Sequence, residues 1–108
     1  MTELIVHLLD LLQPLGEVRA RRMFGGYGLY LGDRMFGLVA DDILYFKVDA
    51  DSEGDYADSG LPCFSYMRQG RSVTIRSFRQ APAEALEQGE DLCRRAGRAA
   101  QAAHSGKG

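Results

Sequence analysis

Cysteine and histidine are scarce in this sequence, and their positions argue against most covalent and metal chemistry. The 108 residues include two cysteines, Cys63 and Cys93, which form no C-x-x-C pair, and two histidines, His7 and His104, near opposite ends. We expect both cysteines to be free, buried thiols in a reducing compartment. The sequence shows no Ser-His-Asp, Cys-His or metal-spaced cluster, so we predict no catalytic residue, no metal and no cofactor, and therefore no enzyme.

The sequence also lacks a large excess of charge of one sign and long apolar runs. The formal net charge is −2, so the chain as a whole is not an electrostatic nucleic-acid binder. The first residues, MTELIVHLLDLL, have no basic region, and Glu3, His7 and Asp10 interrupt their apolar run. This start is neither a signal peptide nor a membrane span, and we expect a cytoplasmic protein with no membrane partner.

Two ligand-binding motifs are present only in part. Gly25, Gly26 and Gly28 precede a strand pattern rather than a helix, and the Lys-Ser/Thr of a phosphate loop is missing. The acidic stretch at residues 49–60, DADSEGDYADSG, has Gly60 where a calcium loop needs its bidentate glutamate. We therefore interpret residues 52–59 as a short helix with a polar outer face, closed by Gly60.

The most informative stretch is MFGGYGLYLGDRMFGLVADDILYFKV, residues 23–48, which predicts three antiparallel strands. Gly32-Asp33 and Asp41-Asp42 separate its apolar runs, and both residue types tolerate the left-handed backbone of a two-residue turn. Counting outward from such turns predicts the register. The predicted pairs are Leu31 with Arg34, Leu29 with Phe36, Tyr27 with Leu38, Leu38 with Tyr45, and Phe36 with Lys47.

This count makes both faces of the predicted sheet apolar. One face carries Tyr27, Leu29, Leu31, Phe36, Leu38, Ile43 and Tyr45, and the other carries Tyr30, Met35, Val39, Leu44, Phe46 and Val48. The second face also has Gly28 opposite Gly37, and either Phe46 shields these glycines or a helix approaches them closely. A sheet with one wet face alternates apolar and polar residues, so this sheet needs two covers.

Another molecule is a candidate for one of the two covers, because large exposed apolar patches mark interfaces. We therefore expect a protein partner and a homodimer. The predicted interaction surface comprises Tyr27, Tyr30, Phe36, Tyr45 and Phe46.

The flanking segments complete an α+β domain. The patterns predict helices at residues 3–13, 82–87 and from residue 90 onward, and further strands at residues 17–23, 63–67 and 72–78. We expect an antiparallel or mixed sheet of five to six strands, with the N-terminal and C-terminal helices packed on it. Residues 1–104 would form one domain and residues 105–108 a disordered tail.

Arginines provide an alternative function. Arg19, Arg21, Arg22 and Arg34 form the main basic cluster, and the helix face from Arg94 to Arg98 forms another. Nucleic-acid contact would need these arginines on one surface. Charged side chains that blunt an edge strand explain the first cluster as well, so nucleic acid is the less favoured partner.

The run RRMFGGYGLYLGDRMFGLVADDILYFKVD resembles the TfoX/Sxy N-terminal-domain family. So do the G-x-P-x-F-x-Y segment that begins at Gly60 and the later segment APAEALEQGEDL. The resemblance covers nearly the whole chain. It implies an α+β fold related to secretion chaperones and no established catalytic residues. The best-known members are cytoplasmic regulators of competence and DNA uptake that act with a cyclic-AMP receptor protein at promoters. These members carry a second, C-terminal domain. We expect this chain, in contrast, to be a single-domain member that keeps the interaction module, and the resemblance implies a transcription regulator as its partner.

Overall fold

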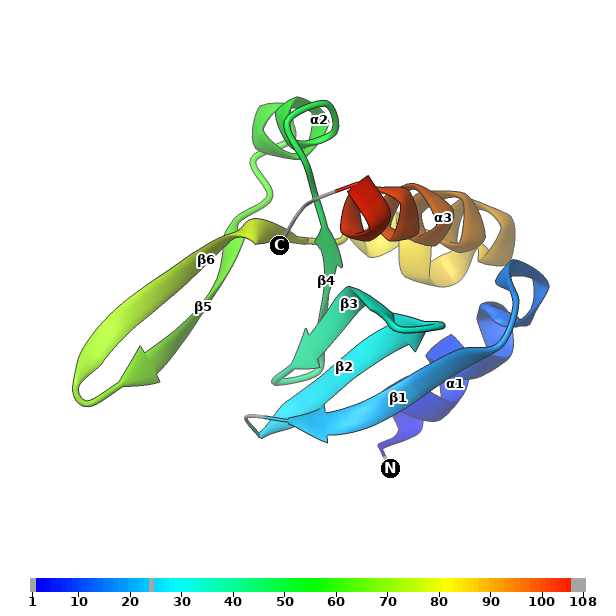
Figure 1. Cartoon of the computed structure of the whole chain (residues 1–108), viewed down its shortest axis with the longest axis horizontal. Coiled ribbons are helices and arrows are strands. Elements are labelled where there is room, and N and C mark those ends of the chain that lie inside the picture. Colours follow the sequence, from blue (N-terminus) through cyan, green and yellow to red (C-terminus); the bar gives the residue numbers. More distant parts are fainter. Residues whose placement is uncertain (1, 24, 106–108) are drawn as a thin grey trace.

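The computed structural model describes residues 2–23 and 25–105, which form helices packed on a six-stranded antiparallel sheet (Figure 1). The order is α1 (Glu3–Leu11), η1 (Gln13–Leu15), β1 (Val18–Met23), β2 (Gly26–Leu31), β3 (Arg34–Ala40), β4 (Ile43–Lys47), α2 (Glu53–Asp58), β5 (Cys63–Arg68), β6 (Arg71–Gln80), η2 (Ala83–Glu87) and α3 (Gly89–Ser105). The strands lie in the order β1-β2-β3-β4-β6-β5. The predicted α+β class is confirmed. Apart from Ser105, the last residue of α3, the predicted tail lies outside the described residues.

Helices cover one face of the sheet and form the main core with it (Figure 1). Ile5, Leu8 and Leu12 recur at helical spacing along α1 and its C-terminal cap, and all three are fully buried. From α3, the small side chains of Ala96 and Ala99 let the helix approach the sheet closely. The sheet residues in this core are Leu29, Phe36, Val39, Leu44, Phe46 and Val48.

Both tight turns of the central meander are confirmed. Gly32 has a φ of 64° in the first turn, and Asp41 and Asp42 have φ values of 53° and 62° in the second. Two consecutive left-handed residues match the right-handed twist of the strands on either side of a hairpin turn.

The register between β2 and β3 contains a bulge that the sequence did not reveal. The observed pairs are Tyr27–Val39, Gly28–Leu38, Leu29–Gly37, Tyr30–Met35 and Leu31–Arg34. The pair next to the turn agrees with the prediction, whereas the predicted pairs of Leu29 with Phe36 and of Tyr27 with Leu38 are wrong. The register shifts between Leu29 and Tyr30, so Phe36 has no direct partner there. One extra residue in a strand reverses the face of every side chain beyond it.

The bulge changes which aromatic side chains share a face. Phe36 and Phe46 were expected on opposite faces, but both are fully buried in the core beneath the helices. Gly37 lies opposite Leu29 rather than Gly28, and it pairs with Phe46 across β3 and β4. The predicted neighbourhood of Phe46 and Gly37 is therefore confirmed, while the predicted glycine pair is wrong.

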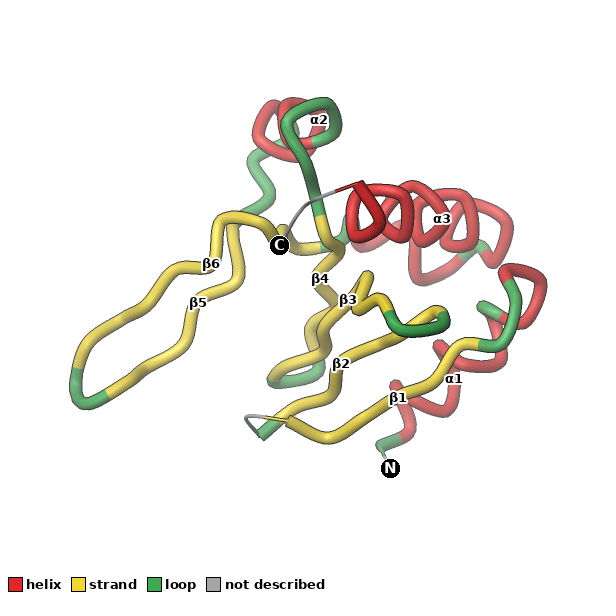
Figure 2. Tube along the Cα trace, viewed as in Figure 1, coloured by secondary structure: helices red, strands yellow, loops and turns green. Residues whose placement is uncertain are grey.

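The sheet bends where β6 passes from β4 to β5. Residues 78–80 of β6 pair with β4, while Arg79 and residues 71–75 pair with β5, with an irregularity between Cys63 and Phe64. Figure 2 shows the β5–β6 hairpin projecting away from the helices. A second apolar cluster lies at this bend, with Leu38, Phe64 and Phe78 buried at its centre.

Candidate interaction surface

The face of the sheet turned away from the helices is the candidate site, and we call it the open face. Its apolar side chains gather around Leu38, Phe64 and Phe78, with Met35, Ala40, Tyr45, Tyr66 and Ile75 half-buried around them. Among the described residues, this second cluster has members only from β3, β4, β5 and β6, and none from a helix. The helices that complete the main core therefore leave this cluster at the surface.

Aromatic rings form a continuous ridge on the open face. The Tyr45 ring meets the Phe64 ring edge to face, with centroids 5.1 Å apart, and the Phe64 ring stacks on Tyr66 at 5.8 Å. Both geometries are favourable for aromatic pairs. Partial burial, with the charge of Asp41 as a second cause, raises the pKa of the Tyr45 hydroxyl. The Tyr45 hydroxyl of the ridge therefore stays neutral at physiological pH.

Because Gly28 has no side chain, a second apolar patch with two flexible methionine side chains forms beside the ridge. A Cβ atom at Gly28 would lie 2.7 Å from the Met35 Sδ atom, 2.8 Å from the Met23 Sδ atom and 3.1 Å from the Tyr30 ring. The three side chains therefore occupy the space that a larger residue would fill. The Arg21 guanidinium lies 5.5 Å from the centroid of the Tyr30 ring, within cation–π range.

The charges of the chain are segregated between the sheet and the rest. None of the six strands contains an aspartate or a glutamate, while they contain Arg19, Arg21, Arg22, Arg34, Lys47, Arg68, Arg71, Arg76 and Arg79. The sheet residues therefore carry nine of the thirteen lysines and arginines and none of the fifteen acidic residues. The small net charge is therefore the sum of a basic sheet and of an acidic remainder of the chain.

Arg19, Arg21 and Lys47 are among the cations that lie on the open face. Arg19 and Arg21 pair with Tyr30 and Gly28 across the β1–β2 ladder, and Lys47 pairs with Phe78, whose ring centroid is 5.5 Å from the Lys47 Nζ atom. Within the described part of the chain, none of these three cations forms an ion pair. The open face is therefore both apolar and electropositive.

The structure divides the residues predicted for an interaction surface. Tyr30 and Tyr45 lie on the open face and are half-buried. Tyr27 packs against the main core, and Phe36 and Phe46 have no exposed surface. A partner on the open face could therefore contact only Tyr30 and Tyr45 of these five residues without unfolding the domain.

The predicted basic cluster is also divided. Arg22 pairs with Tyr27 and Arg34 with Leu31, which places both arginines on the side of the helices, opposite to Arg19 and Arg21. On α3, Arg94 and Arg95 both form ion pairs with Asp91, and Arg98 forms one with Asp49. The structure therefore does not gather these arginines on a single basic surface.

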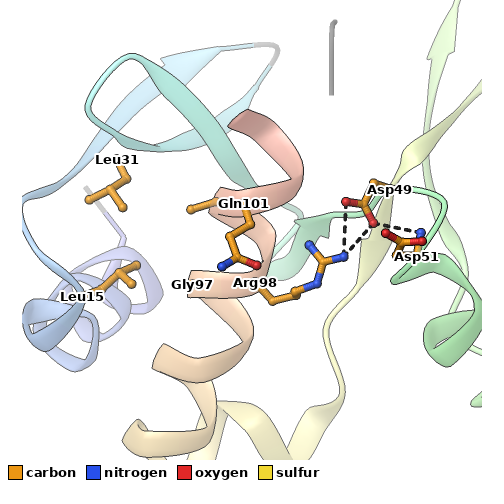
Figure 3. A pocket seen from close by; sticks show the side chains of 8 residues that line it. Leu15, Leu31, Asp49, Asp51, Gly97, Arg98 and Gln101 are labelled. Carbon is orange, nitrogen blue, oxygen red and sulfur yellow. Dashed lines mark hydrogen bonds and ion pairs between the residues drawn. The ribbon is translucent and has the colours of Figure 1, made fainter. Parts of the chain in front are cut away.

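A hollow of about 610 Å³ lies on the helical side, between η1, the end of β2 and α3 (Figure 3). Leu15 and Leu31 line one part of it, and Asp49 and Arg98 line the other, with their side chains 2.9 Å apart. Burial raises the pKa of Asp49, but hydrogen bonds from Arg98 and Ser52 outweigh it and leave the pKa below its usual value. These two charged groups of the hollow therefore satisfy each other.

Other chemistry has little support in the described part of the chain. Within residues 2–23 and 25–105, no three His, Cys, Asp or Glu side chains are grouped to hold a metal ion. Cys63 and Cys93 are free, as predicted, and half-buried, and the Cys93 thiol donates to the Leu11 carbonyl oxygen at 3.1 Å. No described helix has the length and apolar character needed to cross a membrane.

Sequence reasoning missed most of the open face. Phe64, Tyr66, Ile75 and Phe78 come from the β5–β6 hairpin, which the sequence pattern predicted only as two further strands. The alternation of Phe64 with Tyr66 was a usable signal, because two aromatic residues two positions apart lie on one face of a strand. The depletion of acidic residues in every strand was a second signal.

Comparisons with known proteins agree on one family. The family model of the TfoX N-terminal domain matches residues 10–103. The chain is 30% identical over 78 residues, 72% of its length, to 37% of DNA transformation protein TfoX1 of Aliivibrio fischeri (strain ATCC 700601 / ES114). It is 32% identical over 71 residues, 65% of its length, to 34% of Protein Sxy of Escherichia coli (strain K12). The aligned part covers little more than a third of either relative.

Proposed function

This chain belongs to the TfoX N-terminal domain family, and from that premise we propose that it is a cytoplasmic, non-catalytic protein-interaction domain that regulates DNA uptake. The similarity to DNA transformation protein TfoX1 supports the biological context. The open face supports the biochemical role.

The observation that carries the proposal is the composition of the open face. Tyrosine, methionine and arginine are enriched at the centres of protein interfaces, whereas aspartate and glutamate are depleted there. The open face combines Tyr30, Tyr45, Met35 and Arg21 around a buried centre, with no strand carboxylate. These side chains are anchored by their neighbours in the sheet, so little conformational entropy is lost when a partner binds.

Affinity capture from the source cell tests this role. We expect the wild-type chain to retain a protein partner after nuclease treatment of the lysate, and we expect Tyr45→Glu to lose it. Val6→Glu is the matched control, because Val6 is 57% exposed on α1, on the helical side of the sheet. Equal capture by all three chains would contradict the use of the open face.

The same variants test the biological context. We expect deletion of the gene to change the transformation frequency of the source bacterium, and we expect the wild type and Val6→Glu, but not Tyr45→Glu, to restore it. An unchanged transformation frequency on deletion would refute a role in DNA uptake and leave the interaction role standing.

Direct nucleic-acid contact is the second candidate, and it is favoured by Arg19 and Arg21 on β1, which form no ion pair with any described residue. The ion pairs of Arg94, Arg95 and Arg98 count against the other predicted basic face. Capture that disappears on nuclease treatment, together with binding that weakens steeply with salt, would support this candidate instead.

A further inference from the structure

We propose that the open face binds an acidic segment of a different protein, with the segment's apolar side chains on the Tyr45–Phe64–Tyr66 ridge and its carboxylates on Arg19, Arg21 and Lys47. The inference rests on the proposed interaction role and adds the chemistry of the partner. It follows from the distribution of charge on the open face, from the burial of the aromatic rings and from the two-fold symmetry that a homodimer would have.

Charge complementarity selects an acidic partner. Arg19, Arg21 and Lys47 lie on the open face without a carboxylate partner among the described residues. The Arg21 guanidinium and the Lys47 ammonium lie 5.5 Å from the ring centroids of Tyr30 and Phe78, and this cation–π attraction limits how far the charges move away from the surface. Cations held in place beside an apolar ridge favour carboxylates that arrive with apolar neighbours.

A second copy of this chain fits the open face poorly. A two-fold dimer brings the same surface from both subunits together. Such a dimer would place Arg19, Arg21 and Lys47 of each copy in one interface, where no strand residue supplies a carboxylate. Like charges across an interface oppose association, so the homodimer expected from sequence is not the arrangement that this face favours.

Single-stranded nucleic acid also fits less well than a polypeptide. Stacked bases need accessible ring faces. Phe64 and Phe78 are buried, and the Tyr30 ring already faces the Arg21 guanidinium. Met23 and Met35, by contrast, give a flexible apolar surface of the kind that adapts to peptide side chains.

Selection of short random peptides on the immobilised full chain tests the proposal. We expect the enriched peptides to combine aspartate or glutamate with aromatic or aliphatic residues. The dissociation constant of a selected peptide should rise about tenfold or more in the variant Arg19→Glu/Arg21→Glu/Lys47→Glu. The dissociation constant should rise similarly in Tyr45→Ala. Binding to the wild-type chain should weaken when the salt concentration rises from about 50 to about 300 mM. Arg22→Glu/Arg34→Glu, which reverses two charges on the helical side, is the control and should change the dissociation constant by less than about threefold.

The possible results separate the two levels of the proposal. Peptides that require Tyr45 but are neutral, or that ignore the charge reversals and the salt, would overturn the acidic partner and leave the interaction domain intact. Peptides that do not require Tyr45 would overturn both. Tighter binding of oligothymidylate than of any peptide, or sedimentation equilibrium showing a dimer that Tyr45→Glu dissociates, would assign the face to nucleic acid or to a second copy. If the triple variant fails to fold, the salt dependence of the wild type decides the question of charge.

Discussion

Two adjacent residues of β4 test whether the two faces of the sheet play different roles. Phe46 is fully buried beneath the helices, whereas Tyr45 points to the open face and is half-buried. Removing a fully buried phenylalanine costs about 3–5 kcal/mol, because the lost apolar contacts and the cavity add. Tyr45→Ala removes a ring that stays partly in contact with water, and we expect a loss of about 1 kcal/mol, mainly from its edge contact with Phe64.

Urea denaturation followed by circular dichroism measures both losses. The free energy of unfolding falls by about 1–3 kcal/mol per molar urea for a domain of this size. A loss of about 4 kcal/mol therefore lowers the midpoint for Phe46→Ala by about 1.5–4 M, a large share of a typical total stability of about 5–15 kcal/mol. Tyr45→Ala should lower it by less than about 1 M. Equal losses would show that the open face is a structural core and would refute its role as a binding surface.

Three further results are expected. Gly26→Ala should cost several kcal/mol or prevent folding, because its Cβ would lie 2.1 Å from the Val39 carbonyl oxygen; Gly54→Ala, inside α2 with no atom nearby, should be neutral or slightly stabilising in the same urea assay. Asp91→Asn should lower the free energy of unfolding at pH 7, and by progressively less as the pH falls below about 4, because the hydrogen bond from Arg95 lowers the pKa of Asp91; the stabilisation is present above the unfolded value near 3.9 and is lost as the pH falls through the folded value. Arg98→Met should accelerate amide hydrogen exchange in residues 49–58, which its ion pair with Asp49 ties to α3, and unchanged exchange would show that this ion pair does not hold the segment.

Turns and helices were predictable from sequence because their signals are local. The pairs Gly32-Asp33 and Asp41-Asp42 form the expected two-residue turns, and the helices at both ends follow their apolar periodicity. Leu38, Tyr45 and Phe46 were assigned to the wrong faces relative to β2 because nothing in the alternation of β2 or β3 marks the bulge, and one extra residue reverses the face of every side chain beyond it. The structure, and not the sequence, therefore shows that Phe36 and Phe46 are buried on the same face of the sheet.

The candidate site was harder to predict because it joins distant segments. The bend in β6 brings Phe64 and Phe78 to the same cluster as Leu38, and no spacing within the sequence encodes that bend. The sequence did show that apolar side chains lie on both faces of the sheet. It could not show which face the helices leave open, because that depends on the bulge.

The central claim is that the open face, and not the helical side, contacts the partner. Its most direct test is the amide spectrum of the isotopically labelled chain during titration with a selected acidic peptide. We predict that the largest chemical-shift changes occur at Arg21, Leu38, Tyr45 and Tyr66, while α1 and the hollow beside Arg98 remain unchanged. Changes concentrated on α1 and α3, with these four residues unaffected, would contradict the account.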